Sequence, residues 1–202
     1  MKHEGWDRLS DPFGLELDGT QRGQLDAYVA LLRERAIPLG FVSASDEARL
    51  KGRHVEDSLR ATQLVAPTDQ SSYDLGSGAG LPGIPIAVAC PWLHVTLVES
   101  RRTRAAFLEL AVERLGLGTR VEVFAGPVDA LAEPVSLCFA RAFASPGRSW
   151  ATAHPLLVAG GRLLYFAGEG FEASALSADV QIEVTASAAL ARSGPLVIMA
   201  WT

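Results

Sequence analysis

The feature that most constrains this sequence is a glycine-rich loop between a strand pattern and a helix pattern. Residues 74–83 read DLGSGAGLPG; a short strand expected at 72–75 ends at the first glycine, and a helix is expected over about 83–91. Glycine has no Cβ, so a loop of this kind can turn sharply and let its backbone approach a ligand closely. A strand, such a loop and a helix are typical of the ligand-binding edge of an α/β sheet.

The rest of the chain after this loop alternates between strand and helix patterns. Further strands are expected at 94–99, 120–124, 135–139, 162–166, 179–185 and 195–201, and further helices at 101–115 and 148–158. Strands separated by helices indicate a parallel sheet with right-handed crossovers. The last two strands have no convincing helix between them, which indicates an antiparallel edge. We therefore expect an α/β fold with a doubly wound, mostly parallel sheet.

The first third of the chain has a different pattern. Apolar residues recur at helical spacing from Thr20, and a second helical stretch runs from Ser45 to Pro67, with Gly52 as a candidate break. We expect an N-terminal helical extension over residues 1–66 and a ligand-binding domain over 67–202, forming one compact unit. A chain of 202 residues with 49% hydrophobic residues can supply such a core.

Composition excludes several classes of protein. The net charge of -5 argues against a surface that is basic all over, although a local basic face remains open. Cys90 and Cys138 lack metal-ligand spacing and are expected to be reduced core residues, with a disulfide as the minor alternative. We expect no metal site. The N-terminus has no signal-peptide pattern, and no run reaches about 18 apolar residues, so we expect a cytoplasmic protein.

Two acidic residues indicate which ligand the loop binds. Glu99 ends the next strand about 20 residues after the loop, where an acid can accept hydrogen bonds from the ribose hydroxyls of an adenosine cofactor. The spacing of Gly76, Gly78 and Gly80 differs from the dinucleotide fingerprint, and Asp74 would repel a phosphate but suit an ammonium group. S-adenosylmethionine carries an ammonium and a sulfonium and no phosphate, so it is the expected cofactor. For the loop, the alternatives are a bare turn and a site for another nucleotide. For Glu99, the alternative is an exposed acid at the end of a strand, and for Asp74 it is a cap on the following turn.

Three motifs resemble one family. They are RHVEDSL at 53–59, GSGAGLPGIP at 76–85 and RAFA at 141–144. The chain resembles, over about residues 20–200, the glucose-inhibited division protein B family, which methylates N7 of a guanine in small-subunit (16S) ribosomal RNA. The resemblance implies a class I S-adenosylmethionine-dependent methyltransferase fold with an N-terminal helical extension. It also implies ribosomal RNA or the small ribosomal subunit as the partner; we expect a monomer without membrane contact.

The family's functional residues map onto a few positions of this chain. By resemblance, Gly76 and Leu81 line the cofactor loop, and Val128 and Asp129 flank the adenine. Arg141, at the end of the fourth strand, is placed beside the cofactor and the target base and is the candidate catalytic residue. A helix N-cap is the alternative for Asp129, and a structural ion pair is the alternative for Arg141.

The chain departs from the family's pattern at three positions. Gly40, Pro127 and Ala167 stand where relatives carry polar or basic groups that face RNA or the reacting centre. Two other functions therefore stay open. One is a methyltransferase that acts on a different RNA or on a small molecule, and the other is a non-catalytic protein that binds the cofactor or RNA.

Basic and titratable residues near the loop suggest further contacts. Arg101, Arg102 and Arg104 open the helix after the second strand and are candidates for contact with RNA phosphates. The alternative is a solvated helix face. His54 and Asp57 lie near one face of a helix and indicate a structural cluster that pins the extension to the main domain, with substrate contact as the alternative.

The expected chemistry needs few catalytic groups. Guanine N7 carries a lone pair and no proton, so methyl transfer to it requires no general base. Catalysis can rest on positioning and on the electric field around the transferring methyl. The lack of a Ser/His/Asp or Cys/His constellation fits this mechanism, and it also fits an inactive protein.

Overall fold

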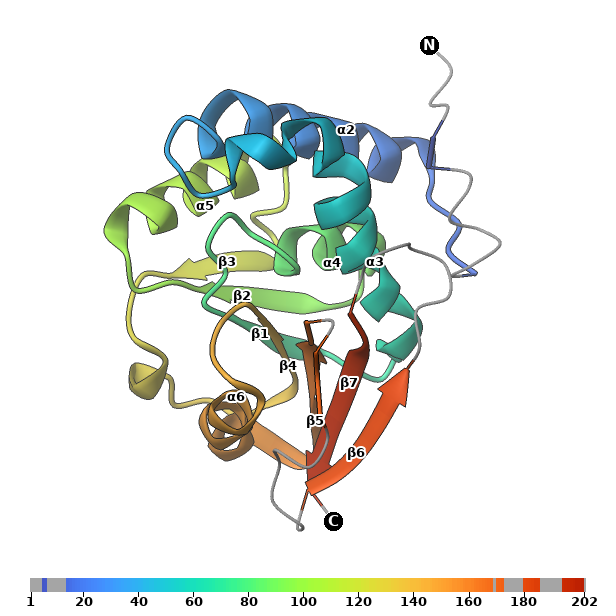
Figure 1. Cartoon of the computed structure of the whole chain (residues 1–202), viewed down its shortest axis with the longest axis vertical. Helices are drawn as coiled ribbons and strands as arrows, with labels where there is room; N and C mark the ends of the chain where they lie inside the picture. The colour runs from blue at the N-terminus through green and yellow to red at the C-terminus, as the bar shows by residue number, and fades with distance from the viewer. Residues whose placement is uncertain (1–4, 7–13, 169, 173–179, 186–193, 202) are drawn as a thin grey trace.

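A seven-stranded sheet with helices on both faces forms the centre of the protein (Figure 1). The computed structural model describes residues 5–6, 14–168, 170–172, 180–185 and 194–201, and the seven strands are those found within these ranges. Their order is β3-β2-β1-β4-β5-β7-β6. β1 and β4 are neighbours near the middle of the sheet, and strand order reverses between them, which is where α/β sheets bind their ligands.

The sheet confirms the predicted topology. Five strands run parallel: β1 (Ser71–Leu75), β2 (His94–Val98), β3 (Val121–Phe124), β4 (Val135–Arg141) and β5 (Leu157–Phe166). β7 (Leu196–Trp201) pairs antiparallel with β5 and with β6 (Val180–Thr185). The connecting helices are α4 (Gly83–Ala89), α5 (Arg102–Arg114) and α6 (Pro146–Ala153). The fold is thus doubly wound and mostly parallel, with an antiparallel edge.

The N-terminal part is helical, but less regular than expected. It contains α2 (Gly19–Leu31), α3 (Asp57–Leu59) and short helical turns over Leu32–Ala36, Ala44–Arg49, Leu50–Glu56 and Arg60–Leu64. α2 begins with a capping box, in which Asp18 accepts from the backbone N–H of Gln21 and the Gln21 side chain accepts from the Asp18 N–H. The stretch after Ser45 is a succession of tight and wide turns, not one continuous helix.

One predicted helix was wrong in its extent. The sequence predicts a helix over 148–158, but α6 ends at Ala153, a turn covers His154–Leu156, and β5 already begins at Leu157. Pro155 has no backbone N–H to continue a helix. The glycine pair 160–161 lies within β5, near an irregularity in the register between β5 and β4, and Gly160 takes a positive φ of 77°.

Two hydrophobic clusters cover the two faces of the sheet. The larger one joins residues of the extension, such as Leu25 and Leu59, to Ile84 of α4 and Leu108 of α5. The smaller one packs Trp150 of α6 against the other face. The extension therefore shares its core with the sheet. Both cysteines are buried and free, and no helix of the described residues is long and apolar enough to cross a membrane.

Candidate functional site

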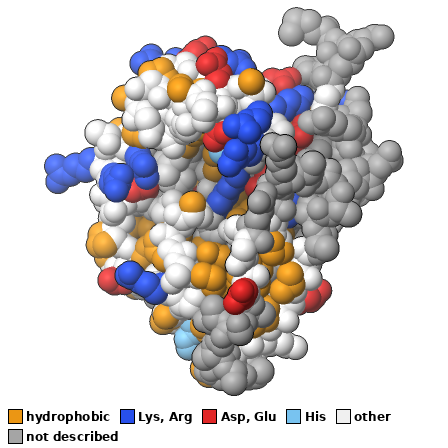
Figure 2. Space-filling view, viewed as in Figure 1, with side chains coloured by type: hydrophobic (Ala, Val, Ile, Leu, Met, Phe, Trp, Pro, Cys, Tyr) orange, Lys and Arg blue, Asp and Glu red, His pale blue; other side chains and the backbone are white. Residues whose placement is uncertain are grey.

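A cavity of about 430 Å³ lies at the carboxyl ends of β1 and β4, where the topology predicts a ligand site. Its walls come from the extension, the glycine loop, α5 and the end of β4: Phe41, Val42, Ser43, Arg53, His54, Gly76, Ser77, Gly78, Ala79, Leu81, Arg104, Arg141 and Ala142. Figure 2 shows Lys and Arg side chains on this face over the helical turns of the extension and at the beginning of α5. The cavity is thus shared between the extension and the sheet.

The glycine loop forms one wall and needs glycine for two different reasons. Gly76 and Gly78 take positive φ values of 68° and 59°, which side chains rarely adopt. A Cβ on Gly76 would lie 2.7 Å from the ring of Phe143, so this position is also crowded. A Cβ on Gly78 would meet no atom within 3.8 Å. At Gly78 the requirement for glycine therefore comes from the backbone conformation and not from crowding.

Glu99 lies beside the loop, as the sequence predicts. Its Oε2 accepts from the Gly78 N–H at 3.1 Å, and its Oε1 accepts from the Arg101 N–H at 2.9 Å. The carboxylate is 5% exposed and ties the loop to the start of α5. A carboxylate has about four acceptor positions, so these two bonds leave capacity for two ribose hydroxyls.

Asp74 is buried beneath the loop. Its Oδ2 accepts from the Gly83 N–H at 3.1 Å and so caps the beginning of α4, which is the alternative that the sequence left open. Its Oδ1 has no hydrogen-bond partner among the described residues. Burial raises the pKa of Asp74 to about 7. The Asp74 contact with a cofactor amino group stays a prediction.

The guanidinium of Arg141 reaches back from β4 to the extension. Nη1 donates to the carbonyl of His54 at 3.1 Å and to Ser58 Oγ at 3.2 Å, and Nη2 donates to the carbonyl of Arg53 at 3.1 Å. Nη2 also lies 3.2 Å from Oδ2 of Asp57. Arg141 thus has the structural ion pair expected as the alternative, and it also lines the cavity.

Asp57 joins two guanidinium groups into one cluster. Its Oδ1 lies 2.8 Å from Nε of Arg60, whose Nη1 donates to the carbonyl of Gly194 at 3.1 Å. The side chains of Asp57 and Arg60 are 8% and 5% exposed. We call Arg141, Asp57 and Arg60 the arginine clamp, because they connect β4, the extension and the segment that enters β7.

His54 lies between an acid and the clamp. Its Nε2 is 3.2 Å from Asp46 Oδ2, and its Nδ1 is 3.4 Å from Nη2 of Arg141. Arginine can only donate, so Nδ1 is the acceptor and Nε2 carries the proton that Asp46 accepts. Burial, followed by the nearby charge of Arg141, lowers the pKa of His54. His54 is therefore neutral near pH 7 and part of the structural cluster that the sequence predicts.

The sequence matches the family model described as GidB, rRNA small subunit methyltransferase G, over residues 21–192. This chain belongs to that family. It is 38% identical over 159 residues to the ribosomal RNA small subunit methyltransferase G of Acidiphilium cryptum, covering 76% of this chain and 71% of that protein. The protein of the same name from Roseiflexus castenholzii is 37% identical over 197 residues, covering 95% and 80%.

Solved structures agree on the fold of this family member. The O-methyltransferase TomG from Streptomyces achromogenes, solved in complex with SAM, superposes with a TM-score of 0.61 at 14% identity, covering 100% of this chain and 99% of that one. A protein from Corynebacterium glutamicum gives a TM-score of 0.58 at 17% identity, covering 87% of this chain and 90% of that one. At such identities the likeness concerns the fold alone.

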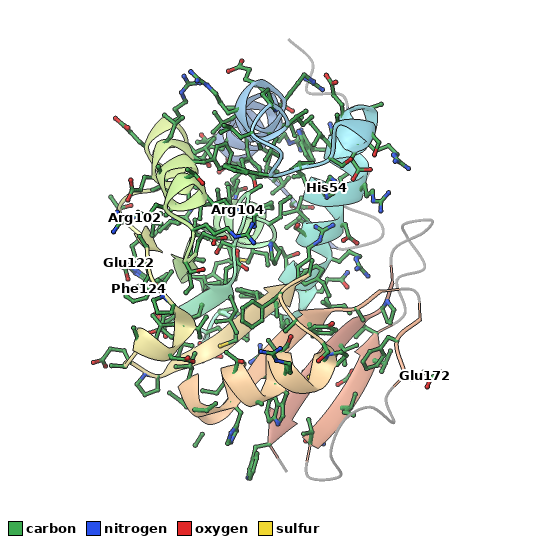
Figure 3. The ribbon with its side chains drawn as sticks, turned by 60° about the vertical axis from the view of Figure 1, so that its left-hand side comes forward. His54, Arg102, Arg104, Glu122, Phe124 and Glu172 are labelled. Carbon is green, nitrogen blue, oxygen red and sulfur yellow. The ribbon has the colours of Figure 1, made fainter. Side chains whose placement is uncertain are left out.

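Of the remaining residues predicted for the site, Arg104 lines the cavity, whereas Val128, Asp129, Arg101 and Arg102 are not among the residues that line it. Val128 and Asp129 fall in a helical turn over Val128–Ala130; Val128 packs against the smaller core and Asp129 is exposed. Arg101 and Arg102 are exposed, whereas Arg104 lines the cavity. Figure 3 shows Arg104 pointing toward the space between α5 and the turn that carries His54, with Arg102 at the outer edge.

Three residues of the extension that line the cavity were not predicted from the sequence. Phe41, Val42 and Ser43 line it from the turn after Leu32–Ala36. Their position depends on how the extension packs on the sheet, and no local pattern signals it. Ala142, next to Arg141, was also missed; it takes a positive φ of 51°, which is strained for a residue with a Cβ.

Proposed function

We propose that this protein is an S-adenosylmethionine-dependent methyltransferase that methylates N7 of a guanine in small-subunit ribosomal RNA. The observation that carries the proposal is the family match over residues 21–192, whose motif residues converge on one cavity. Relatives that align with most of the chain are named ribosomal RNA small subunit methyltransferase G.

The residues around the glycine loop fit the cofactor. Asp74 Oδ1 is buried without a partner among the described residues, as expected of an acceptor that awaits an ammonium group directly or through water. Glu99 keeps acceptor capacity beside Gly78, which suits ribose hydroxyls. Residues 76–81 would hold the methionine part, and Val128 and Asp129 would flank the adenine. When bound, the cofactor supplies an electrophilic methyl group on its sulfonium.

The protein's own groups would act by positioning and by their charge. The acceptor N7 has no proton to lose, so the site needs no general base. The histidine that lines the cavity, His54, is neutral and already donates its Nε2 proton to Asp46. Phe41, Val42 and Leu81 would exclude water, and Arg141 would face the target base from the end of β4.

The acceptor is proposed to be RNA, held in part by phosphate contacts. Arg101, Arg102 and Arg104 stand at the beginning of α5 beside the cavity, and cations there suit a polyanion. That the protein acts as a cytoplasmic monomer without membrane contact stays a prediction.

A labelling experiment tests the function. Purified protein is incubated with methyl-labelled S-adenosylmethionine and small ribosomal subunits, or their naked RNA, from cells that lack this methyltransferase. We expect label in the small-subunit RNA, recovered as 7-methylguanosine after nuclease digestion. Gly78→Arg is the matched variant, because a long side chain at this positive φ, on a residue that lines the cavity, would block the loop. It should abolish both labelling and the heat of cofactor binding.

Other results would assign another function. Folded wild-type protein that gives no heat with S-adenosylmethionine would contradict every cofactor-based interpretation. Cofactor binding without transfer to any acceptor would favour a non-catalytic binding protein. Label in a different RNA or in a small molecule would favour a changed acceptor, which is motivated by the loss of polar groups at Gly40, Pro127 and Ala167.

A further inference from the structure

The charged side chains that line the cavity are all basic. Arg53, Arg104 and Arg141 all line the cavity, and none of the described residues that line it is acidic. A concave wall that presents guanidinium groups and no carboxylate favours an anionic group on a ligand.

Two of these three arginines already have close acidic partners outside the cavity. Nη2 of Arg141 lies 3.2 Å from Asp57, within the arginine clamp. Nη1 of Arg53 lies 3.3 Å from Asp46, and its side chain is more than half exposed. Neither guanidinium is left without compensation.

Arg104 has the longest ion pair of the three. Its Nη1 lies 3.9 Å from Glu99 Oε2, which is beyond hydrogen-bond distance, and it donates no hydrogen bond to any described residue. Glu99 instead accepts from the backbone N–H groups of Gly78 and Arg101. The side chain of Arg104 is only 28% exposed, so its donors are held near the cavity without being used.

Phe41 gives this guanidinium a defined place. The Cζ atom of Arg104 lies 5.5 Å from the centroid of the Phe41 ring, and that ring packs edge-on against Phe107 at 5.7 Å and 76°. A Cβ on Gly78 would lie 3.9 Å from Nη1 of Arg104, so the guanidinium stands next to the glycine loop. An aromatic ring orients a guanidinium without neutralising it. Figure 3 shows Arg104 between α5 and the turn that carries His54.

We propose that Arg104 holds an anionic group of a ligand in the cavity, and that Phe41 is the residue that positions it. This inference rests on the proposed function. The anion has two possible sources that share their chemistry: the carboxylate of S-adenosylmethionine and a phosphate of the acceptor RNA. Both have paired oxygens that match the planar fork of an arginine.

Binding measurements with Arg104→Gln separate the two sources. Calorimetry gives the dissociation constants of S-adenosylmethionine and of its decarboxylated form, and filter binding gives that of the small-subunit RNA at several salt concentrations. If the cofactor carboxylate is the anion, the variant binds S-adenosylmethionine about tenfold more weakly than wild type but binds the decarboxylated form equally well. If an RNA phosphate is the anion, cofactor binding is unchanged, RNA binding weakens about tenfold, and the salt slope falls by about one.

Three further variants give the test its controls. Arg104→Lys keeps the charge but not the fork and should recover part of the binding. Phe41→Leu should weaken the same step about two- to threefold, because the ring contact is lost while Arg104 remains. Arg114→Gln, at the other end of α5 and paired with the exposed Glu34, should bind both ligands like wild type.

Unchanged binding in the Arg104 variants would overturn the proposal. If folded Arg104→Gln binds the cofactor, its decarboxylated form and the RNA as Arg114→Gln does, Arg104 holds no anion. If Arg104→Gln does not fold, unchanged binding by folded Phe41→Leu and Arg104→Lys overturns it equally. Failure of the proposed function differs from both, because wild-type protein would then transfer no methyl group to small-subunit RNA.

Discussion

At the scale of single residues, Asp74 makes stability depend on pH. Burial raises the pKa of its carboxyl to about 7 in the folded protein, from 3.8 ordinarily. Between these two values the folded state binds more protons than the unfolded state, so this group lowers stability as pH rises through that range. We expect Asp74→Asn to remove this loss, because the amide is uncharged and its oxygen can still accept from the Gly83 N–H.

The measurement is the free energy of unfolding in urea at pH 5 and at pH 8 for both proteins. The advantage of Asp74→Asn over wild type should grow between these values by an amount on the order of a few kcal/mol. His54 acts in the opposite direction, because its lowered pKa costs stability at low pH, but its effect is the same in both proteins and cancels. An advantage that stays constant with pH would contradict the role given to Asp74.

Individual residues of the site differ in how well the sequence predicts them. The glycine spacing and the position of Glu99 after the second strand follow from local pattern, and the structure brings these residues together. The sequence gives no reason to distinguish Arg101 from Arg104, and only the packing of α5 places Arg104 in the cavity wall. Phe41 carries no local signal, because its place beside Arg104 depends on contacts 63 positions apart in the chain.

At the scale of elements, the arginine clamp holds three segments together. Asp57 lies between Arg141 of β4 and Arg60, which reaches the segment before β7. Asp57→Asn would remove the counter-charge of the buried Arg60 and of the partly buried Arg141, and removing one partner of a buried pair costs about 3–5 kcal/mol. Urea unfolding should show this loss, whereas Glu47→Gln, which removes the exposed pair with Arg33, should cost less than about 1 kcal/mol. Equal losses in the two variants would contradict the clamp.

Element boundaries were predictable where one local rule dominates. The alternation of apolar strands with helices predicts the sheet from β1 to β5, and the missing helix near the end predicts the antiparallel edge. The boundary between α6 and β5 was wrong, because the glycine pair was interpreted as a turn while the register irregularity keeps it inside the strand. The extension breaks into turns because contacts such as those of Asp46 with Arg53 and His54 compete with a regular helix.

At the scale of the whole molecule, we propose that the extension and the sheet unfold as one unit. The larger core contains residues from both, and Tyr28 of α2 donates from its hydroxyl to the carbonyl of Ala79 in the glycine loop at 2.7 Å. Two independent domains would unfold in two steps, whereas a shared core couples them.

Leu25→Ala tests this coupling, because Leu25 is fully buried on α2 and belongs to the shared core. The cavity left behind should cost about 2–5 kcal/mol. Unfolding is followed by far-ultraviolet circular dichroism, which reports on the helices, and by near-ultraviolet circular dichroism, which reports on packed aromatic rings such as Trp150 on the opposite face. The two unfolding transitions should shift together to the same lower midpoint. Leu39→Ala in the same extension, with Leu39 57% exposed, should leave both midpoints nearly unchanged. A shift of the helical signal alone would mean that the extension folds by itself, and the cavity would then depend on docking between two separate units.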